Sequence, residues 1–171
     1  MINVPFNNLT ISKKAGYYIQ PFLFQIMIKL PFQIKEVLKM LKGTSYVITG
    51  STALFLQNTI HRVPGDLDLL TADEEVLNIL KQNCTLDLSE TLSSPTHHRF
   101  LLWDCWYVDV FWTKKTTAIT KKVGSIDVNI SPYWEVFNTK LKLFSGDPKT
   151  AQDIKDYFTL KEQSAIKHLE L

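Results

Sequence analysis

The chain has 171 residues, of which 45% are hydrophobic and 12% aromatic, so it is long and apolar enough for one globular domain and is not a disordered protein. Its 19 basic and 17 acidic side chains give a net charge of +2, which is too even a balance to identify a nucleic-acid binder. No Cys-x-x-Cys or His-x-x-x-His cluster supports a zinc site.

The first 30 residues show little periodicity and contain two prolines. They are expected to form an irregular arm, or a helix that packs on the domain or on a partner. The apolar part, residues 17–30, is too short and too interrupted to span a bilayer, and it lacks the features of a signal peptide. We therefore expect a cytoplasmic protein that makes no membrane contact.

Residues 31–163 are predicted to form one domain, and residues 164–171 a C-terminal tail. The first helix begins at Pro31 and ends at Gly43, and residues 46–49 are a short buried strand rich in β-branched side chains. Ser51 or Thr52 is expected to cap a second helix that ends near residue 59. A strand over 67–71 and a helix that begins at Asp73 follow.

The second half is predicted to be rich in strands. Residues 84–91 alternate weakly, and residues 99–103 and 106–112 are predicted to be paired strands joined at Asp104-Cys105. A strand over 125–130 and helices over 131–144 and 150–163 complete the order. This order predicts an α+β domain with a mixed β-sheet and helices packed on one side.

Asp66 and Asp68 are two residues apart on a predicted strand, so their side chains leave the same face. Two carboxylates this close repel each other, and Mg²⁺ or Mn²⁺ would relieve that cost while leaving coordination positions for substrate phosphates. Two solvated acids at the end of a strand are the alternative.

Asp109 lies in the middle of an apolar strand, where an unpaired carboxylate is costly. Its position makes sense beside a metal held by Asp66 and Asp68. A two-metal site could then activate the attacking oxygen of a phosphoryl transfer and stabilise the leaving oxygen. The alternative is the solvated face of an edge strand. Asp104 and Asp127 are weaker candidates at a turn and at the start of a strand.

Gly50-Ser51 forms a turn into a helix, where free backbone N–H groups favour an anion. Glycine lets the backbone approach a phosphate closely, and Ser51 adds a hydroxyl. Capping alone would also explain this pair. The P-loop pattern is absent, and so is the Gly-x-Gly-x-x-Gly pattern of a dinucleotide site.

Residues 49–54 (TGSTAL) and 62–69 (RVPGDLDL) together resemble the signature of the polymerase-β-type nucleotidyltransferase superfamily, and more narrowly the AbiEii toxin-like bacterial enzymes. The resemblance covers roughly residues 32–160. It implies the nucleotidyltransferase fold, with Asp66, Asp68 and Asp109 as metal and catalytic carboxylates and Gly50, Ser51 and Lys140 as the nucleotide-binding residues. Lys149 and residues 153–156 resemble the closing Lys-Asp-x-x-Asp helix, and Arg62 either holds its loop or meets substrate.

The resemblance implies transfer of a nucleoside monophosphate from an NTP to an acceptor hydroxyl on an RNA or tRNA end, a protein or a small molecule. A toxin–antitoxin setting, with an antitoxin as partner, belongs to the same implication. Pro64 stands where Ser or Thr is usual, and Gln152 precedes Asp153 in the closing motif. A catalytically inactive interaction protein with the same fold is the alternative, and an Asp-x-Asp glycosyltransferase is a third option that the upstream Gly-Ser turn disfavours.

Overall fold

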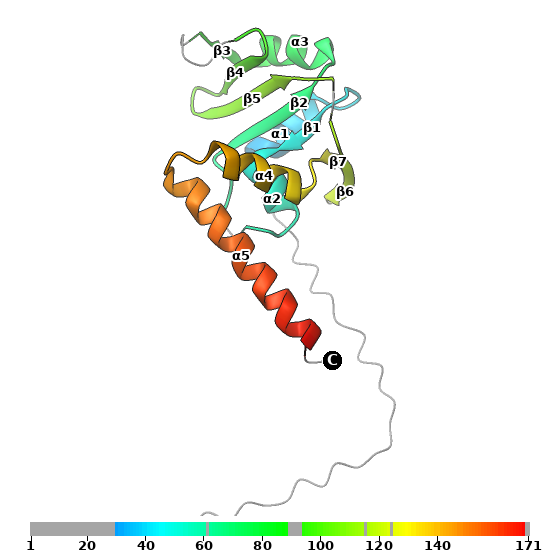
Figure 1. Ribbon diagram of the computed structural model, residues 1–171. Helices are drawn as coiled ribbons and strands as arrows, with labels where there is room; N and C mark the ends of the chain where they lie inside the picture. The colour runs from blue at the N-terminus through cyan, green and yellow to red at the C-terminus, as the bar shows by residue number, and fades with distance from the viewer. Residues whose placement is uncertain (1–29, 61, 89–93, 115, 124, 170–171) are drawn as a thin grey trace, which may run out of the picture.

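The computed structural model describes residues 30–60, 62–88, 94–114, 116–123 and 125–169, so the predicted arm lies outside the described residues except for Leu30. Five helices and seven strands occur within these ranges (Figure 1). Their bounds are α1 Phe32–Met40, β1 Val47–Thr49, α2 Gly50–Leu56, β2 Asp66–Thr71, α3 Glu74–Asn83, β3 Thr85–Asp87, β4 His97–Leu102, β5 Trp106–Trp112, β6 Ile119–Val123, β7 Ile126–Ile130, α4 Tyr133–Leu143 and α5 Pro148–Leu169.

The strands form one mixed sheet in the order β3-β4-β5-β2-β1-β7-β6. The pairs β2–β5 and β1–β7 are parallel, whereas β1–β2, β4–β5, β3–β4 and β6–β7 are antiparallel. The α+β class and the mixed sheet predicted from the sequence are confirmed. The neighbouring central strands β2 and β5 carry Asp66, Asp68 and Asp109, the acidic residues that the sequence singled out.

The two faces of the central strands differ in what covers them. Leu67 and Leu69 of β2 are fully buried and belong to a core that includes Ile34 of α1 and Leu80 of α3. Because side chains alternate along a strand, Asp66 and Asp68 point to the opposite face, and both are only partly covered. The core therefore holds β2 in place while its carboxylates point away from the core and stay partly accessible.

Three strand predictions needed correction. Strand β6 was not predicted, because its residues are mostly exposed and three of its five residues are polar. Strand β3 covers only Thr85–Asp87 of the predicted 84–91, and residues 89–93 lie outside the described ones. The turn between β4 and β5 centres on Trp103 and Asp104, which both have positive φ (51° and 54°), so the predicted connection at Asp104-Cys105 was one residue too late.

The predicted cap of α2 by Ser51 or Thr52 was wrong. Thr49 is the N-cap residue, without a side-chain cap bond, and the two hydroxyls are used elsewhere. Thr52 Oγ1 donates to the carbonyl oxygen of Asp66 at 2.9 Å, which ties the start of α2 to β2. Ser51 Oγ lies in the polar network described below.

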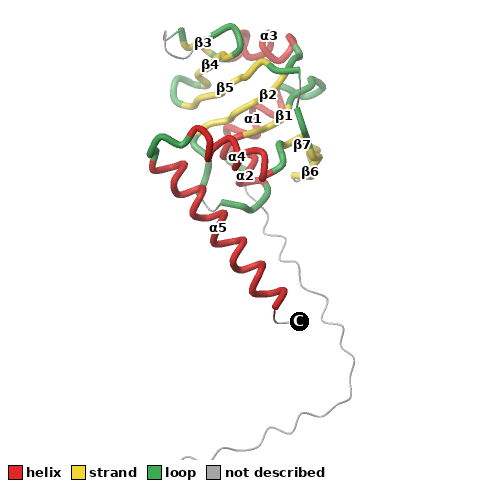
Figure 2. Tube along the Cα trace, in the orientation of Figure 1, coloured by secondary structure: helices red, strands yellow, loops and turns green. Residues whose placement is uncertain are grey.

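Helix α5 packs on the domain through its N-terminal part and then projects away from it (Figures 1 and 2). It runs to Leu169, so it continues beyond residue 164, where the tail was predicted to begin. Near its start Asp153 is fully buried, and Ile154 and Tyr157 pack against the core. None of the helices in the described ranges is long and apolar enough to cross a membrane.

Candidate active site

The acidic residues gather on one face of neighbouring strands. Asp68 of β2 is the register partner of Asp109 on the parallel strand β5 and of Thr49 on the antiparallel strand β1. Asp66 lies two residues before Asp68 on the same face. The predicted trio of carboxylates is therefore brought together by the register of β2 and β5.

Gly50 allows the backbone to approach Asp68 closely. It has a positive φ of 59°, which L side chains rarely adopt, and a Cβ added there would lie 1.8 Å from Asp68 Oδ2. The predicted Gly-Ser turn thus meets the predicted metal ligand directly, and no side chain fits between them.

Asp68 lies in an environment that opposes its negative charge. Burial, followed by repulsion from Asp66 and Asp109, raises the pKa of Asp68 to about 7. Within the described residues, no hydrogen bond or ion pair satisfies this carboxylate. A hard divalent cation would supply the missing charge, so Asp66 and Asp68 fit such an ion.

Asp109 differs because its carboxylate already has partners. Arg99 of β4 donates to both of its oxygens, and His97 Nε2 lies 2.8 Å from Oδ1. In the described part of the chain, no three His, Cys, Asp or Glu side chains are arranged to hold one metal ion. The metal role predicted for Asp109 stays a prediction.

Beside the acids lies a network centred on Asp153 of α5. Arg62 Nε donates to Asp153 Oδ1 at 2.6 Å and Arg62 Nη2 to Oδ2 at 2.9 Å, and Lys140 Nζ lies 3.0 Å from Oδ2. Ser51 Oγ donates to Oδ2 at 3.1 Å and accepts from Arg62 Nη2 at 2.6 Å and from Lys140 Nζ at 3.3 Å. The two predicted phosphate contacts, Ser51 and Lys140, therefore lie side by side.

The two groups line one pocket of about 140 Å³. Asp66 and Asp68 form its acidic side and Arg62, Lys140 and Lys149 its basic side. The remaining lining residues are Ser51, Gly65, Asp147 and Thr150. A space with carboxylates on one side and cations on the other can hold a metal ion and a phosphate next to each other.

The site contains residues that the sequence reasoning missed. His97 received no role from the sequence, yet at the first position of β4 its ring contacts Asp109 and stacks on Phe111 with 4.6 Å between ring centroids. Arg99 received no role, although it pairs with Asp109. The available signal was the hairpin itself, because a correct turn would have placed Arg99 directly opposite Asp109.

Comparison of sequences gives no relative: none of the protein-family models and none of the curated proteins matches the chain. Solved structures do match, and they share the nucleotidyltransferase fold. At 13–15% identity the likeness establishes that fold and nothing finer.

Three solved structures resemble this chain over most of their length. TM1012 of Thermotoga maritima, a candidate nucleotidyltransferase, has 15% identity and a TM-score of 0.52 over 74% of this chain and 91% of its own. The lincosamide antibiotic adenylyltransferase LnuA with bound lincomycin has 13% identity and a TM-score of 0.51 over 74% and 92%. ANT(2")-Ia in complex with adenylyl-2"-tobramycin has 13% identity and a TM-score of 0.55 over 80% and 92%.

Proposed function

We propose that this chain is a metal-dependent nucleotidyltransferase that moves an NMP from an NTP to an acceptor hydroxyl. One observation carries the proposal: the unpaired carboxylates of Asp66 and Asp68 and the cations of Arg62 and Lys140 line the same pocket. An NTP bound with a divalent ion presents both charges that such a pocket complements. The shared fold with nucleotidyltransferases agrees with it.

Each side chain has a role in this reaction. Asp66 and Asp68 would hold Mg²⁺ or Mn²⁺, which when bound withdraws charge from the phosphate oxygens. Gly50 and Ser51 would lie against the terminal phosphates, and Lys140 Nζ would neutralise the charge that develops on the leaving group.

The bond changes are those of a single displacement. The acceptor oxygen forms a bond to the α-phosphorus, and the bond from that phosphorus to the bridging oxygen breaks. Pyrophosphate leaves with the electron pair. The hydroxyl proton passes to the carboxylate of Asp109, which Arg99 and His97 hold in place.

The proposed reaction has several possible acceptors, and each corresponds to a different kind of nucleotidyltransferase. An AbiEii-like enzyme would modify an RNA or tRNA end or a protein and would have an antitoxin partner. LnuA is described as a lincosamide antibiotic adenylyltransferase and ANT(2")-Ia contains adenylyl-2"-tobramycin, so a small molecule with a free hydroxyl is the corresponding form here. ATP is one of the four nucleotides to be compared.

A non-catalytic interaction protein is the second candidate. The observation that favours it is that Arg62, Lys140 and Ser51 already bind the carboxylate of Asp153. A triphosphate must compete with Asp153 for these donors. Such a protein keeps the fold without binding NTP.

A thermal-shift measurement with each of the four NTPs tests the proposal, because a ligand that binds only the native state raises the melting temperature. We expect one or more NTPs to raise it in the presence of Mg²⁺ and not in EDTA. No shift with any NTP would favour the interaction protein.

The acidic residues are tested by Asp66→Asn and Asp68→Asn, with Asp104→Asn as the matched control in the exposed β4–β5 turn. Both site variants should lose the Mg²⁺-dependent shift, and NMP transfer should fall by roughly 100-fold or more. The control should keep both. Undiminished transfer in both site variants would contradict the mechanism.

A further inference from the structure

The side chains around Asp109 form a closed cluster on two antiparallel strands. Arg99 of β4 and Asp109 of β5 are register partners, and so are His97 and Phe111. Tyr107, Asp109 and Phe111 lie on one face of β5, two residues apart. We call these five residues the Asp109 cluster.

Arg99 binds Asp109 in a bidentate ion pair. Its Nε lies 2.8 Å from Oδ1 and its Nη2 lies 3.0 Å from Oδ2, while the Asp109 side chain is only 4% exposed. His97 Nε2 lies 2.8 Å from Oδ1. Parallel guanidinium–carboxylate bonds of this kind are among the strongest in proteins.

The partners of Asp109 are themselves held. The guanidinium of Arg99 lies 4.8 Å from the centroid of the Tyr107 ring, and the ring of His97 stacks on Phe111 with 9° between the planes. These contacts restrict the rotamers of Arg99 and His97 before any ligand arrives. The ion pair is therefore a fixed part of the sheet rather than a loose surface contact.

This arrangement changes the charge available to cations. A site with three free carboxylates would attract two divalent ions, but the guanidinium cancels the charge of Asp109. The carboxylates of Asp66 and Asp68 have no such cation paired with them in the described residues. Two negative charges remain, and they match one divalent ion.

We propose that Arg99 takes the place of a second metal ion at Asp109, so that the nucleotide-free protein binds a single divalent cation, at Asp66 and Asp68. The inference rests on the proposed function and names the metal content of that site. Arg99 is a positioning residue in this scheme. Among the described residues, Arg99 Nη2 alone donates to Asp109 Oδ2, so one lone pair of this oxygen can receive the acceptor hydroxyl.

Titration of the nucleotide-free full chain with Mn²⁺, followed by electron paramagnetic resonance of the free ion, tests this. Wild type should bind one Mn²⁺. Arg99→Gln removes the guanidinium, so a positive charge near Asp109 is lost and this variant should bind a second Mn²⁺. The dissociation constant of that second ion should be at least tenfold lower than that of any weak second binding to wild type. Arg99→Lys keeps the charge and should stay at one.

The double variant R99Q/D109N restores the charge balance and is the matched control. It should return to one Mn²⁺ with an affinity within threefold of wild type. It also keeps the test decisive if R99Q alone fails to fold, since loss of the ion in the double variant would show that Asp109 is a ligand and overturn the inference.

The outcomes separate this inference from the function on which it rests. Two Mn²⁺ ions on wild type, or one on a folded R99Q, would overturn the role of Arg99 and leave the nucleotidyltransferase proposal intact. No Mn²⁺ on wild type would overturn the proposed metal site itself.

Discussion

The chain has two arginines, and each pairs with a buried aspartate, but the two pairs differ in what they join. Arg99 and Asp109 are neighbours across one hairpin, ten residues apart in the sequence. Arg62 and Asp153 are 91 residues apart and join the loop before β2 to α5. The first pair is built into the sheet, whereas the second attaches a helix to it.

Asp68 lies between the two pairs and has no arginine. The contrast shows that this chain neutralises two buried carboxylates with guanidinium groups and leaves the partly buried carboxylate of Asp68 with a raised pKa. A carboxylate that is removed from water without a cation beside it costs stability, so we expect a ligand to supply the missing positive charge at Asp68. The following substitutions test that difference.

The largest effect is expected for Asp153→Asn. The change leaves Arg62 and Lys140 without their carboxylate, and breaking a buried ion pair in this way costs roughly 3–5 kcal/mol. Urea denaturation followed by circular dichroism measures the free energy of unfolding. A loss below about 1 kcal/mol would mean that the Arg62 pair contributes no more than an exposed one.

Asp68→Asn should have the opposite sign. The folded-state pKa of Asp68, about 7, lies above the ordinary value of 3.8. The native state therefore favours the neutral carboxyl. The contribution of this preference to the free energy of unfolding is complete below pH 4 and is lost as the pH rises through 7. In EDTA, the variant should exceed wild type in free energy of unfolding by about 2–4 kcal/mol at pH 8, and the two should converge near pH 4.

Mg²⁺ sharpens the same measurement. The ion should stabilise wild type at pH 8 and leave Asp68→Asn unchanged, because it supplies the charge that the carboxylate lacks. Equal free energies of unfolding for wild type and Asp68→Asn at pH 8 in EDTA would show that the charge of Asp68 does not destabilise the native state.

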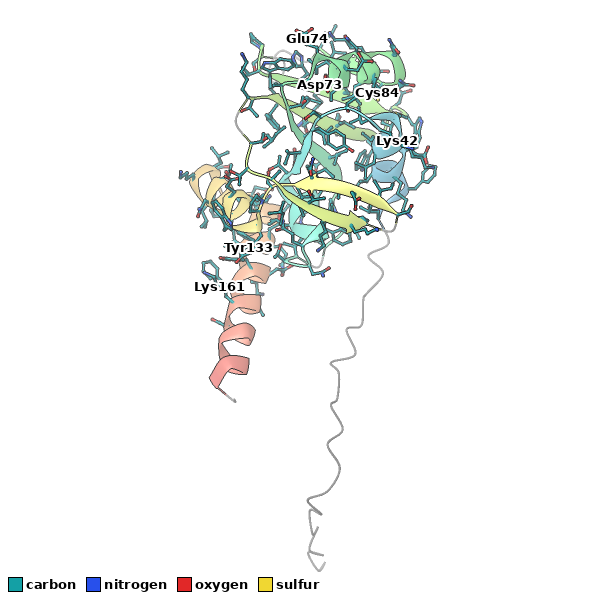
Figure 3. All side chains as sticks on the ribbon, turned by 90° about the vertical axis from the view of Figure 1, so that its right-hand side faces the viewer. Lys42, Asp73, Glu74, Cys84, Tyr133 and Lys161 are labelled. Atoms are coloured by element: carbon teal, nitrogen blue, oxygen red, sulfur yellow. The ribbon has the colours of Figure 1, made fainter. Side chains whose placement is uncertain are left out.

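The smallest effect is expected for Asp73→Ala, at a partly exposed carboxylate far from α5 (Figure 3). Asp73 caps α3 by accepting from Glu75 N and also accepts from Ser45 N. Loss of the cap should lower the free energy of unfolding by about 1 kcal/mol. Melting curves with and without Mg²⁺ should shift equally, whereas an Mg²⁺-dependent shift would place Asp73 in the metal response.

The sequence predicted which candidate site residues lie together better than it predicted the side chains that pair with them. Gly50, Ser51, Asp66, Asp68 and Asp109 were singled out by local signals, namely strand alternation and the Gly-Ser turn, whereas Lys140 was singled out only by the family resemblance. The structure brings these six residues together. Arg99 was missed because the turn between β4 and β5 was predicted one residue too late. With the turn at Asp104-Cys105, Arg99 would lie opposite Val110 and its side chain would leave the wrong face.

The Arg62–Asp153 pair could not be predicted in the same way. No local pattern joins a loop to a helix 91 residues later, and the contact exists only because α5 packs on the domain. The resemblance at residues 153–156 marked the helix without naming its partner. Capping by Ser51 failed for the same reason, since a long-range carboxylate took the hydroxyl.

Asp153 also gives α5 the geometry of a lever. The fully buried anchor lies in the second turn of the helix, and sixteen residues follow it to Leu169, a length of about 24 Å at 1.5 Å per residue. A rotation of 5° about this anchor moves the far end by roughly 2 Å. The projecting end of α5 is thus where the smallest rearrangement among Arg62, Lys140 and Asp153 produces the largest movement (Figure 2).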